Sequence, residues 1–210
     1  MQARRGLRFN ESTHGSGARP VSRQLRGAAC GQNATFTSTL EIRFFSIYAM
    51  TDTRRAYLIE QLAEMPVFLE KGFLGLPREQ FARVPVDDKN SLVEHLWHIR
   101  DCESEFYVPR IEQTLDHDQP PLWPMPDIGS WYVERAYQQR DGDQAIREFT
   151  AIRQQLIERL RALTPDQFER VSLRQNGSTF SIYDMIEHIA DHDRDHRIRM
   201  AGILRSSLLV

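Results

Sequence analysis

Three histidines spaced four residues apart lie near the carboxyl end of the sequence, at His188, His192 and His196. Residues four apart on an α-helix share one face, so these three imidazoles are expected to form a row. The first and last would lie roughly 12 Å apart along the helix axis, whereas metal–nitrogen bonds are only about 2 Å long. One metal ion could therefore contact only two neighbouring histidines of the row, and a further ligand must come from another helix.

The hydrophobic pattern around this row favours the second pair of histidines. The buried side of this helix is predicted at alternating steps of three and four, through Ile182, Met185, Ile189, His192, His196, Met200 and Ile203. His188 lies one position off this line. A buried imidazole without a partner costs a few kcal/mol. Two histidines at these positions favour a metal site, and the alternative is a pair of packed histidines satisfied by carboxylates.

A second helix carries the candidate ligand that completes the site. Ser91 and Glu94 form a predicted capping box at its start, and His98 follows Ser91 by seven residues. His95 and Cys102 lie one turn to either side of His98 and are rival ligands. We interpret His95 as a surface residue or one that contacts a ligand histidine. Cys102 would have to be a thiolate to bind a metal, and a lone helix cysteine is more often a small core residue.

A short internal similarity supports the choice of His98. Residues 76–84 resemble residues 164–171, and each segment precedes a helix that is predicted to begin at a serine. In this alignment His98 corresponds to His188, which indicates that the second and fourth helices are related by an approximate two-fold axis. The similarity and the hydrophobic pattern therefore disagree about the role of His188.

Helical periodicity predicts an all-α fold, a four-helix bundle with short helices or turns in the connections. The long helices are expected at about 51–72, 91–115, 143–163 and from 181 onward, with kinks at Pro66 and Pro109. Short turns are expected at 77–83 and 165–170, and a short helix at 131–139. The connection at 116–130 is long and aromatic, which is typical of a functional loop.

Length and composition limit the classes of protein that this chain can represent. The 210 residues allow one domain and a tail, and the net charge of −2 without an evident basic face argues against nucleic acid as a partner. No apolar run is long enough to span a membrane, so no membrane partner is expected. Two cysteines, Cys30 and Cys102, make no disulfide framework and fit a reducing cytoplasm.

Residues 1–49 differ from the rest of the chain. They are rich in Arg, Ser, Thr, Gly and Ala and poor in acids. This stretch is interpreted as a disordered basic tail, as a transit-like segment, or as untranslated sequence with Met50 as the true start. We favour the last interpretation, which leaves residues 50–210 as the bundle domain.

Together these motifs resemble the DinB/YfiT-like superfamily, which is named for damage-inducible bacterial proteins. The resemblance rests on the serine-capped helix with a histidine seven residues in, followed by a last helix with His-x-x-x-His, and it covers about residues 51–204. It implies an up-down-down-up four-helix bundle that holds a divalent metal through His98, His192 and His196. His188 is assigned a pocket role beside the ligands. The charged run 192–197 departs from the family pattern and affects the polarity expected around the site.

Three neutral imidazoles would leave coordination positions open on a zinc, nickel or iron ion. Asp101, one turn beyond His98, is the first candidate to orient a ligand N–H group or relay protons. Glu94 and Asp191 are the alternatives for that role. An open site beside a pocket lined by tryptophans would favour an enzyme, and Trp97, Trp123 and Trp131 are the tryptophans available. A fourth protein ligand such as Cys102 would favour a structural metal.

The resemblance implies a metal-dependent enzyme acting on a small-molecule substrate. The first expectation is a thiol-dependent S-transferase in detoxification, with a low-molecular-weight thiol as co-substrate, and the second is a metal-assisted hydrolase. A non-catalytic metal-binding stress-response protein is the alternative from another class, and a metal-free bundle with packed histidines is the third. A homodimer that pairs through flat helix faces is one expected assembly.

Overall fold

The computed structural model describes residues 39–84, 88–123 and 125–207, with side chains described between residues 52 and 203. The first helix, α1 (Thr39–Phe73), begins earlier than the start near residue 51 that periodicity predicts. Residues 1–38 lie outside the described part of the chain, and the translation start at Met50 stays a prediction.

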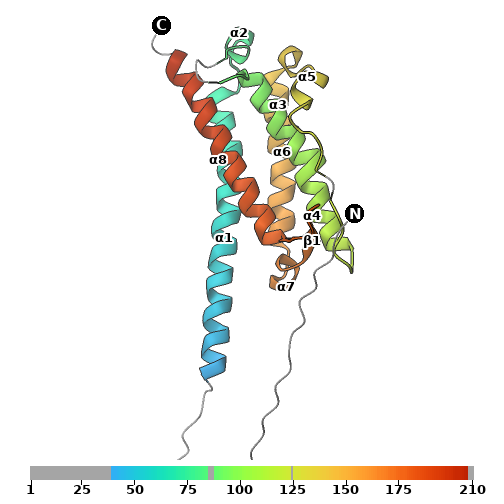
Figure 1. Cartoon of the computed structure of the whole chain (residues 1–210). Helices are drawn as coiled ribbons and strands as arrows, with labels where there is room; N and C mark the ends of the chain where they lie inside the picture. The colour runs from blue at the N-terminus through green and yellow to red at the C-terminus, as the bar shows by residue number, and fades with distance from the viewer. Residues whose placement is uncertain (1–38, 85–87, 124, 208–210) are drawn as a thin grey trace, which may run out of the picture. The chain divides into compact units, whose positions relative to one another are not determined.

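Four long helical segments form the bundle (Figure 1). They are α1, the run from α3 (Leu92–Cys102) through the π-helix η1 (Glu103–Tyr107) to α4 (Val108–Asp116), then α6 (Gly142–Arg161) and α8 (Ile182–Ser207). In Figure 1 α1 rises, the α3–α4 run and α6 descend, and α8 rises. Both α1 and α3 pack against α6 and α8. The expected up-down-down-up bundle is therefore confirmed.

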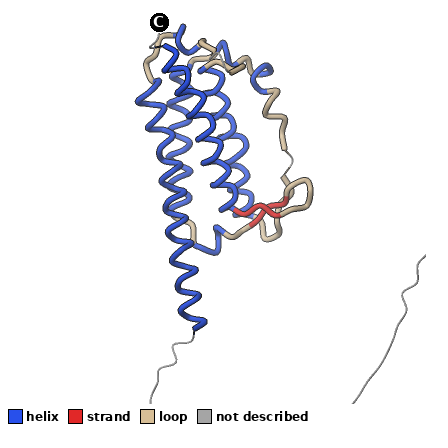
Figure 2. Tube along the Cα trace, turned by 60° about the vertical axis from the view of Figure 1, so that its left-hand side comes forward, coloured by secondary structure: helices blue, strands red, loops and turns tan. Residues whose placement is uncertain are grey.

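This order requires a connection that returns along the bundle between two descending helices. The segment after α4 runs along the outside of the bundle (Figure 2). It is fastened to strand β1 (Val171–Leu173), because Leu173 N donates to Pro121 O at 2.9 Å and Trp123 N donates to Leu173 O at 3.2 Å. The long aromatic loop is thus held against the lower half of the molecule.

Short elements fill the connections: α2 (Arg78–Phe81), α5 (Trp131–Glu134), the 3₁₀-helix η2 (Tyr137–Gln139) and α7 (Pro165–Phe168). The single helix predicted at 131–139 is wrong, because Ala136 adopts a left-handed conformation with φ of 49° and separates α5 from η2. The hairpin of β1 with β2 (Thr179–Ser181) was not predicted. Its turn contains Gly177 at φ of 80°, a backbone region that glycine adopts without strain.

Local sequence explains how the site-bearing helices begin and bend. Glu94 Oε2 accepts from Ser91 N at 2.7 Å, and Asp184 Oδ2 accepts from Ser181 N at 2.8 Å, as the predicted capping boxes require. Pro66 lies inside α1 without ending it. Pro109 is the second residue of α4, two residues after the end of η1. Because proline lacks an N–H and crowds the carbonyl four residues back, the wider π-helical turn accommodates it.

A layer of polar side chains divides the core. One apolar cluster includes Leu62, Cys102 and Ile189, and the other includes Met65, Ile99 and Met200. Between these positions α3, α6, η1 and α8 contribute buried or half-buried polar side chains, namely His98, Glu103, Arg153, His192, Asp193 and His196. Buried polar groups must find partners, so the partners of this layer indicate what it does.

Candidate metal centre

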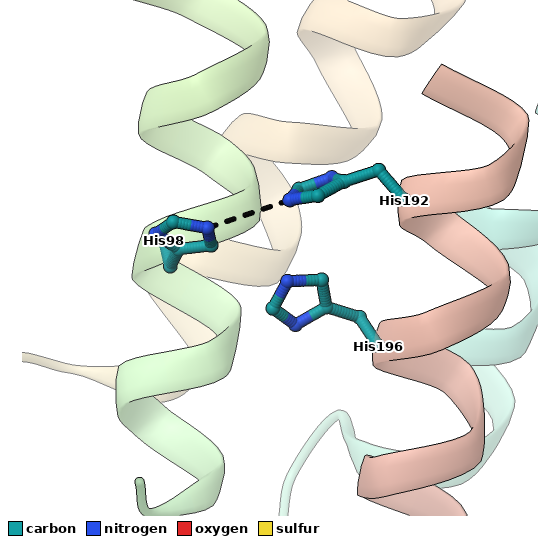
Figure 3. A group of neighbouring side chains, drawn as sticks. All are labelled: His98, His192 and His196. Atoms are coloured by element: carbon teal, nitrogen blue, oxygen red, sulfur yellow. Dashed lines mark hydrogen bonds between the residues drawn. The ribbon is translucent and has the colours of Figure 1, made fainter. Parts of the chain in front are cut away.

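His98 from α3 and His192 and His196 from α8 turn their imidazoles toward one another (Figure 3). One ring nitrogen from each lies within 4.8 Å of the other two, and His98 Nε2 is 3.4 Å from His192 Nε2. Two nitrogens bound tetrahedrally at about 2.1 Å lie roughly 3.4 Å apart. The three residues therefore fit the donor set of a divalent ion such as zinc.

Burial keeps these histidines neutral, which is the form that binds metals. His98 and His196 are buried and His192 is half-buried. Burial, followed by the charge of His95, lowers the pKa of His98 to about 4. Burial, followed by His98, lowers the pKa of His192 to about 3. The pKa of His196 is also well below its usual range, chiefly because of burial. At neutral pH the cluster presents lone pairs, not positive charges.

A hydrogen-bonded chain fixes the tautomer of His196. His95 Nε2 lies 3.1 Å from Asp88 Oδ2, and His95 Nδ1 lies 3.0 Å from His196 Nδ1. A carboxylate only accepts, so His95 Nε2 carries the proton, and burial lowers the pKa of His95 so that the ring is neutral. His95 Nδ1 must then accept from His196 Nδ1–H. The Nε2 lone pair of His196 is left free for a metal, which is the arrangement typical of ligand histidines.

Aromatic rings form the walls around the cluster. Tyr132 stacks on His98 with centroids 4.8 Å apart and planes at 16°. The buried ring of Tyr107 lies edge-on to both His192, at 5.7 Å, and His188, at 5.9 Å. His188 is therefore separated from the three-histidine cluster by Tyr107, and it lines a neighbouring cavity. Sequence analysis missed both tyrosines, since neither lies in a pattern that points to the histidines.

Asp101, the candidate for orienting a ligand or relaying protons, has other partners. Its buried carboxylate accepts from Tyr137 Oη at 2.7 Å, Arg100 Nη1 at 2.8 Å and Arg135 Nη1 at 2.5 Å. None of the hydrogen bonds found among the described residues joins it to the three histidines. Asp101 therefore connects α3 to the segment around η2. The carboxylate that orients a candidate ligand, through His95, is that of Asp88.

The other two carboxylates considered for this role are also engaged elsewhere. Glu94 caps α3, and the exposed Asp191 pairs with Arg194 at 2.8 Å.

Cys102 lies beside His98 but outside the cluster. Its sulfur is 3.5 Å from His98 Nε2, yet it is not among the residues whose donor atoms converge. The side chain is fully buried, and burial strongly raises the pKa of its thiol. A neutral thiol is a poor ligand, so the arrangement favours the interpretation of Cys102 as a core residue.

The tryptophans lie away from the histidines. Trp97 is buried, and its Nε1 donates to Asp141 O at 3.0 Å, at the start of α6. The Trp123 ring lies 5.7 Å from the guanidinium carbon of Arg110. The ring of Trp131 is covered by Arg135 at 3.8 Å. Trp123 therefore lies beside Arg110, which lines the same cavity as His188, but Trp123 is not among the described lining residues and its pocket role stays a prediction.

A second polar cluster lies next to the histidines and was not predicted. Arg153 of α6 is fully buried and donates to Glu103 at 2.9 Å, to Asp193 at 3.2 Å and to Leu62 O at 3.1 Å. Asp193 directly follows His192 in α8. The two clusters therefore share one layer of the core. We call Arg153, Glu103 and Asp193 the Arg153 network.

Comparisons with known proteins agree with this geometry. None of the described helices is long and apolar enough to cross a membrane. No curated protein matches the chain. A solved structure of YfiT from Bacillus subtilis, described as a probable metal-dependent hydrolase with an unusual four-helix bundle topology, superposes with a TM-score of 0.65 at 18% identity. The match covers 73% of this chain and 87% of YfiT. The DinB superfamily profile matches residues 61–200, and the chain belongs to this superfamily.

Proposed function

We propose that the chain is a metal-dependent enzyme that joins a small nucleophile, a cellular thiol or water, to an electrophilic small molecule. His98, His192 and His196 would hold a divalent ion of the zinc, nickel or iron type. The observation that carries the proposal is the convergence of three neutral imidazole nitrogens within 4.8 Å. Among the described residues, no carboxylate or thiolate joins this convergence, which favours open positions for substrate over a closed structural site.

When bound, such an ion would supply Lewis-acid chemistry, which lowers the pKa of a nucleophile or polarises a carbonyl. The residues of the chain prepare the site for this chemistry. Asp88 and His95 hold His196 in the tautomer that frees its Nε2. Tyr107 and Tyr132 cover the histidines and exclude water from two sides. The half-buried His192 lies where solvent and substrate reach the cluster.

Two nucleophiles remain candidates. Transfer of a low-molecular-weight thiol is the first, because the resemblance to this superfamily, whose members include thiol-dependent transferases, implies it. Hydrolysis is the second, because YfiT is described as a probable metal-dependent hydrolase. Both reactions need the same three-histidine site, so metal binding is tested before the nucleophile.

The test is elemental analysis of untagged protein after incubation with zinc or nickel and removal of free metal. We expect about one ion per chain in the parent and in His117→Ala, which removes an exposed histidine bonded to Gln113 O. His98→Ala and His192→Ala should both lose the ion. Metal that stays in both of these variants, or that is missing from the parent, would contradict the proposed site.

The nucleophile is then identified with metal-loaded protein and a panel of electrophiles. Loss of free thiol that depends on His98 would support transfer, and acid release from esters or amides in the absence of thiol would support hydrolysis. Bound metal with neither reaction across the panel would favour the non-catalytic metal-binding alternative.

A further inference from the structure

Arg110 of α4 is a buried cation that has no anionic partner among the described residues. Its side chain is 4% exposed. No hydrogen bond or ion pair of its guanidinium is found among the described residues, and its Nε has no acceptor. Arg153, which is fully buried, pairs with two carboxylates. Because a buried, unpaired charge is costly, Arg110 is a candidate for binding an anion.

Aromatic rings surround this guanidinium instead of carboxylates. Its central carbon lies 5.1 Å from the ring centroid of Phe106, 5.4 Å from that of Phe180 and 5.7 Å from that of Trp123. Trp123 Nε1 is itself a buried donor without a partner. Cation–π contacts offset part of the burial of a cation, but they leave the N–H groups without acceptors.

A cavity of about 450 Å³ opens beside Arg110. Its walls include Phe106, Phe180 and Met125, and its polar groups include Arg174 and His188. Arg174 is held in the β1–β2 turn, with its guanidinium 4.0 Å from the Phe180 ring centroid and no ion pair among those found. None of the described residues that line the cavity is acidic. The volume suits a small ligand with an apolar body.

This cavity is adjacent to the candidate metal centre. His188 precedes His192 by four residues, about one helical turn. Tyr107 separates the two, with ring contacts of 5.9 Å to His188 and 5.7 Å to His192. The cavity and the candidate metal centre are therefore linked through the contacts of one ring, that of Tyr107.

We propose that Arg110 and Arg174, with His188, form a binding site for the carboxylate of a small organic anion. Arginine pairs with carboxylates through two parallel N–H groups, and the apolar walls suit the rest of such a molecule. A phosphate would bring more charge and need more donors, and the N-terminus of α8 nearby is already capped by Asp184. That this anion is part of a substrate rests on the proposed function, whereas its binding does not.

The test is isothermal titration calorimetry on the whole chain stripped of metal with a chelator. The probes are benzoate, its neutral counterpart benzamide, and inorganic phosphate. We expect benzoate to bind the parent about tenfold or more tightly than benzamide, because hydrogen bonds between charged partners are stronger than neutral ones. Phosphate should bind more weakly than benzoate.

Variants connect this binding to the named residues. Arg110→Met, which keeps an apolar stem, should weaken benzoate binding about tenfold or more. Arg174 is exposed, so Arg174→Gln tests the site even if Arg110→Met folds poorly. Arg159→Gln removes a cation that already pairs with Glu112 and should bind benzoate like the parent. His98→Ala should lose metal yet still bind benzoate, which separates this proposal from the proposed function.

Four results would overturn the assignment. They are an absence of heat with benzoate, equal affinity for benzamide, tighter binding of phosphate, and undiminished benzoate binding in both arginine variants.

Discussion

Two polar clusters share one layer of the bundle, and they differ in how they are satisfied. The Arg153 network is closed: one guanidinium donates to Glu103, Asp193 and the carbonyl of Leu62. The three-histidine cluster is open, because His98 and His192 approach each other through ring nitrogens 3.4 Å apart. His192 and Asp193 are neighbours in α8, yet each belongs to a different cluster.

This difference separates a structural role from a ligand-binding role. Within the Arg153 network one guanidinium pairs with two carboxylates and a backbone carbonyl, so the burial of Arg153 raises no need for an external partner. In the histidine cluster, only His196 has its second nitrogen bonded in a chain that ends at a carboxylate. Three ring nitrogens that converge within 4.8 Å, with one hydrogen bond of 3.4 Å found among them, are typical of a binding site.

The largest expected effect is a loss of free energy of unfolding when the closed Arg153 network is broken. Arg153→Met would leave two buried carboxylates, Glu103 and Asp193, without a cation. Breaking a buried ion pair in this way typically costs about 3–5 kcal/mol. Urea unfolding of metal-free protein would measure the loss of free energy of unfolding.

Two matched variants sharpen this result. Arg161→Gln breaks the exposed pair with Glu60 and should cost less than about 1 kcal/mol. His98→Leu should stay within about 1 kcal/mol of the metal-free parent, because no charged partner is stranded. A loss for Arg153→Met no larger than that for Arg161→Gln would mean that the network is not structural.

Sequence periodicity could identify the two candidate ligands in α8 because helix geometry encodes them. His192 and His196 replace apolar residues at steps of three and four, and the structure brings them to His98, seven residues after the helix cap at Ser91. The four long helices followed from the same periodicity, whereas their up-down-down-up order was implied by the resemblance to the DinB/YfiT-like superfamily. Contacts within one helix, and the face that it presents to its neighbours, are local properties of the sequence.

The same spacing also held a signal for Arg153 that an apolar-only pattern overlooks. A pattern read only from apolar residues (Ile146, Phe149, Leu156 and Leu160) predicts Ile152 on the buried side of α6, but Ile152 is half-buried and Arg153 is fully buried. Arg153 lies seven residues after Ile146 and three before Leu156, at the seam position. The hairpin likewise had a signal in Asn176-Gly177. Asp88 had none, because a loop residue meets His95 only through the tertiary fold.

The open cluster should make the stability of metal-free protein depend on pH. Burial holds the pKa of His98 at about 4, against about 6.5 in the unfolded chain. Below pH 6.5 the unfolded state therefore takes up protons first, and the folded state loses stability as the pH falls. Between pH 7 and pH 5 the loss from His98 alone is about 2 kcal/mol.

Urea unfolding at a series of pH values checks this dependence. His98→Leu should reduce the loss of stability between pH 7 and pH 5 by the His98 share of about 2 kcal/mol, and His117→Ala should leave the curve unchanged. If His98→Leu keeps the slope of the parent, other groups produce it, and the contrast between an open and a closed cluster weakens.

The smallest expected effect tests the link that holds the open cluster in position. Asp88→Asn would replace the carboxylate that receives the His95 proton, so that His196 loses its fixed tautomer. Partners of ligand histidines typically contribute a factor of 10–100 to metal affinity. We expect the lower end, about tenfold, because Asp88 acts through His95. Competition with a chelating dye would measure this affinity, and metal content at saturation should not change.

Asp195→Asn removes an exposed carboxylate that is bonded to Arg199 and lies next to His196 in the chain. Equal losses of affinity in Asp88→Asn and Asp195→Asn would reduce the effect to net charge and remove the positioning role of the chain through His95.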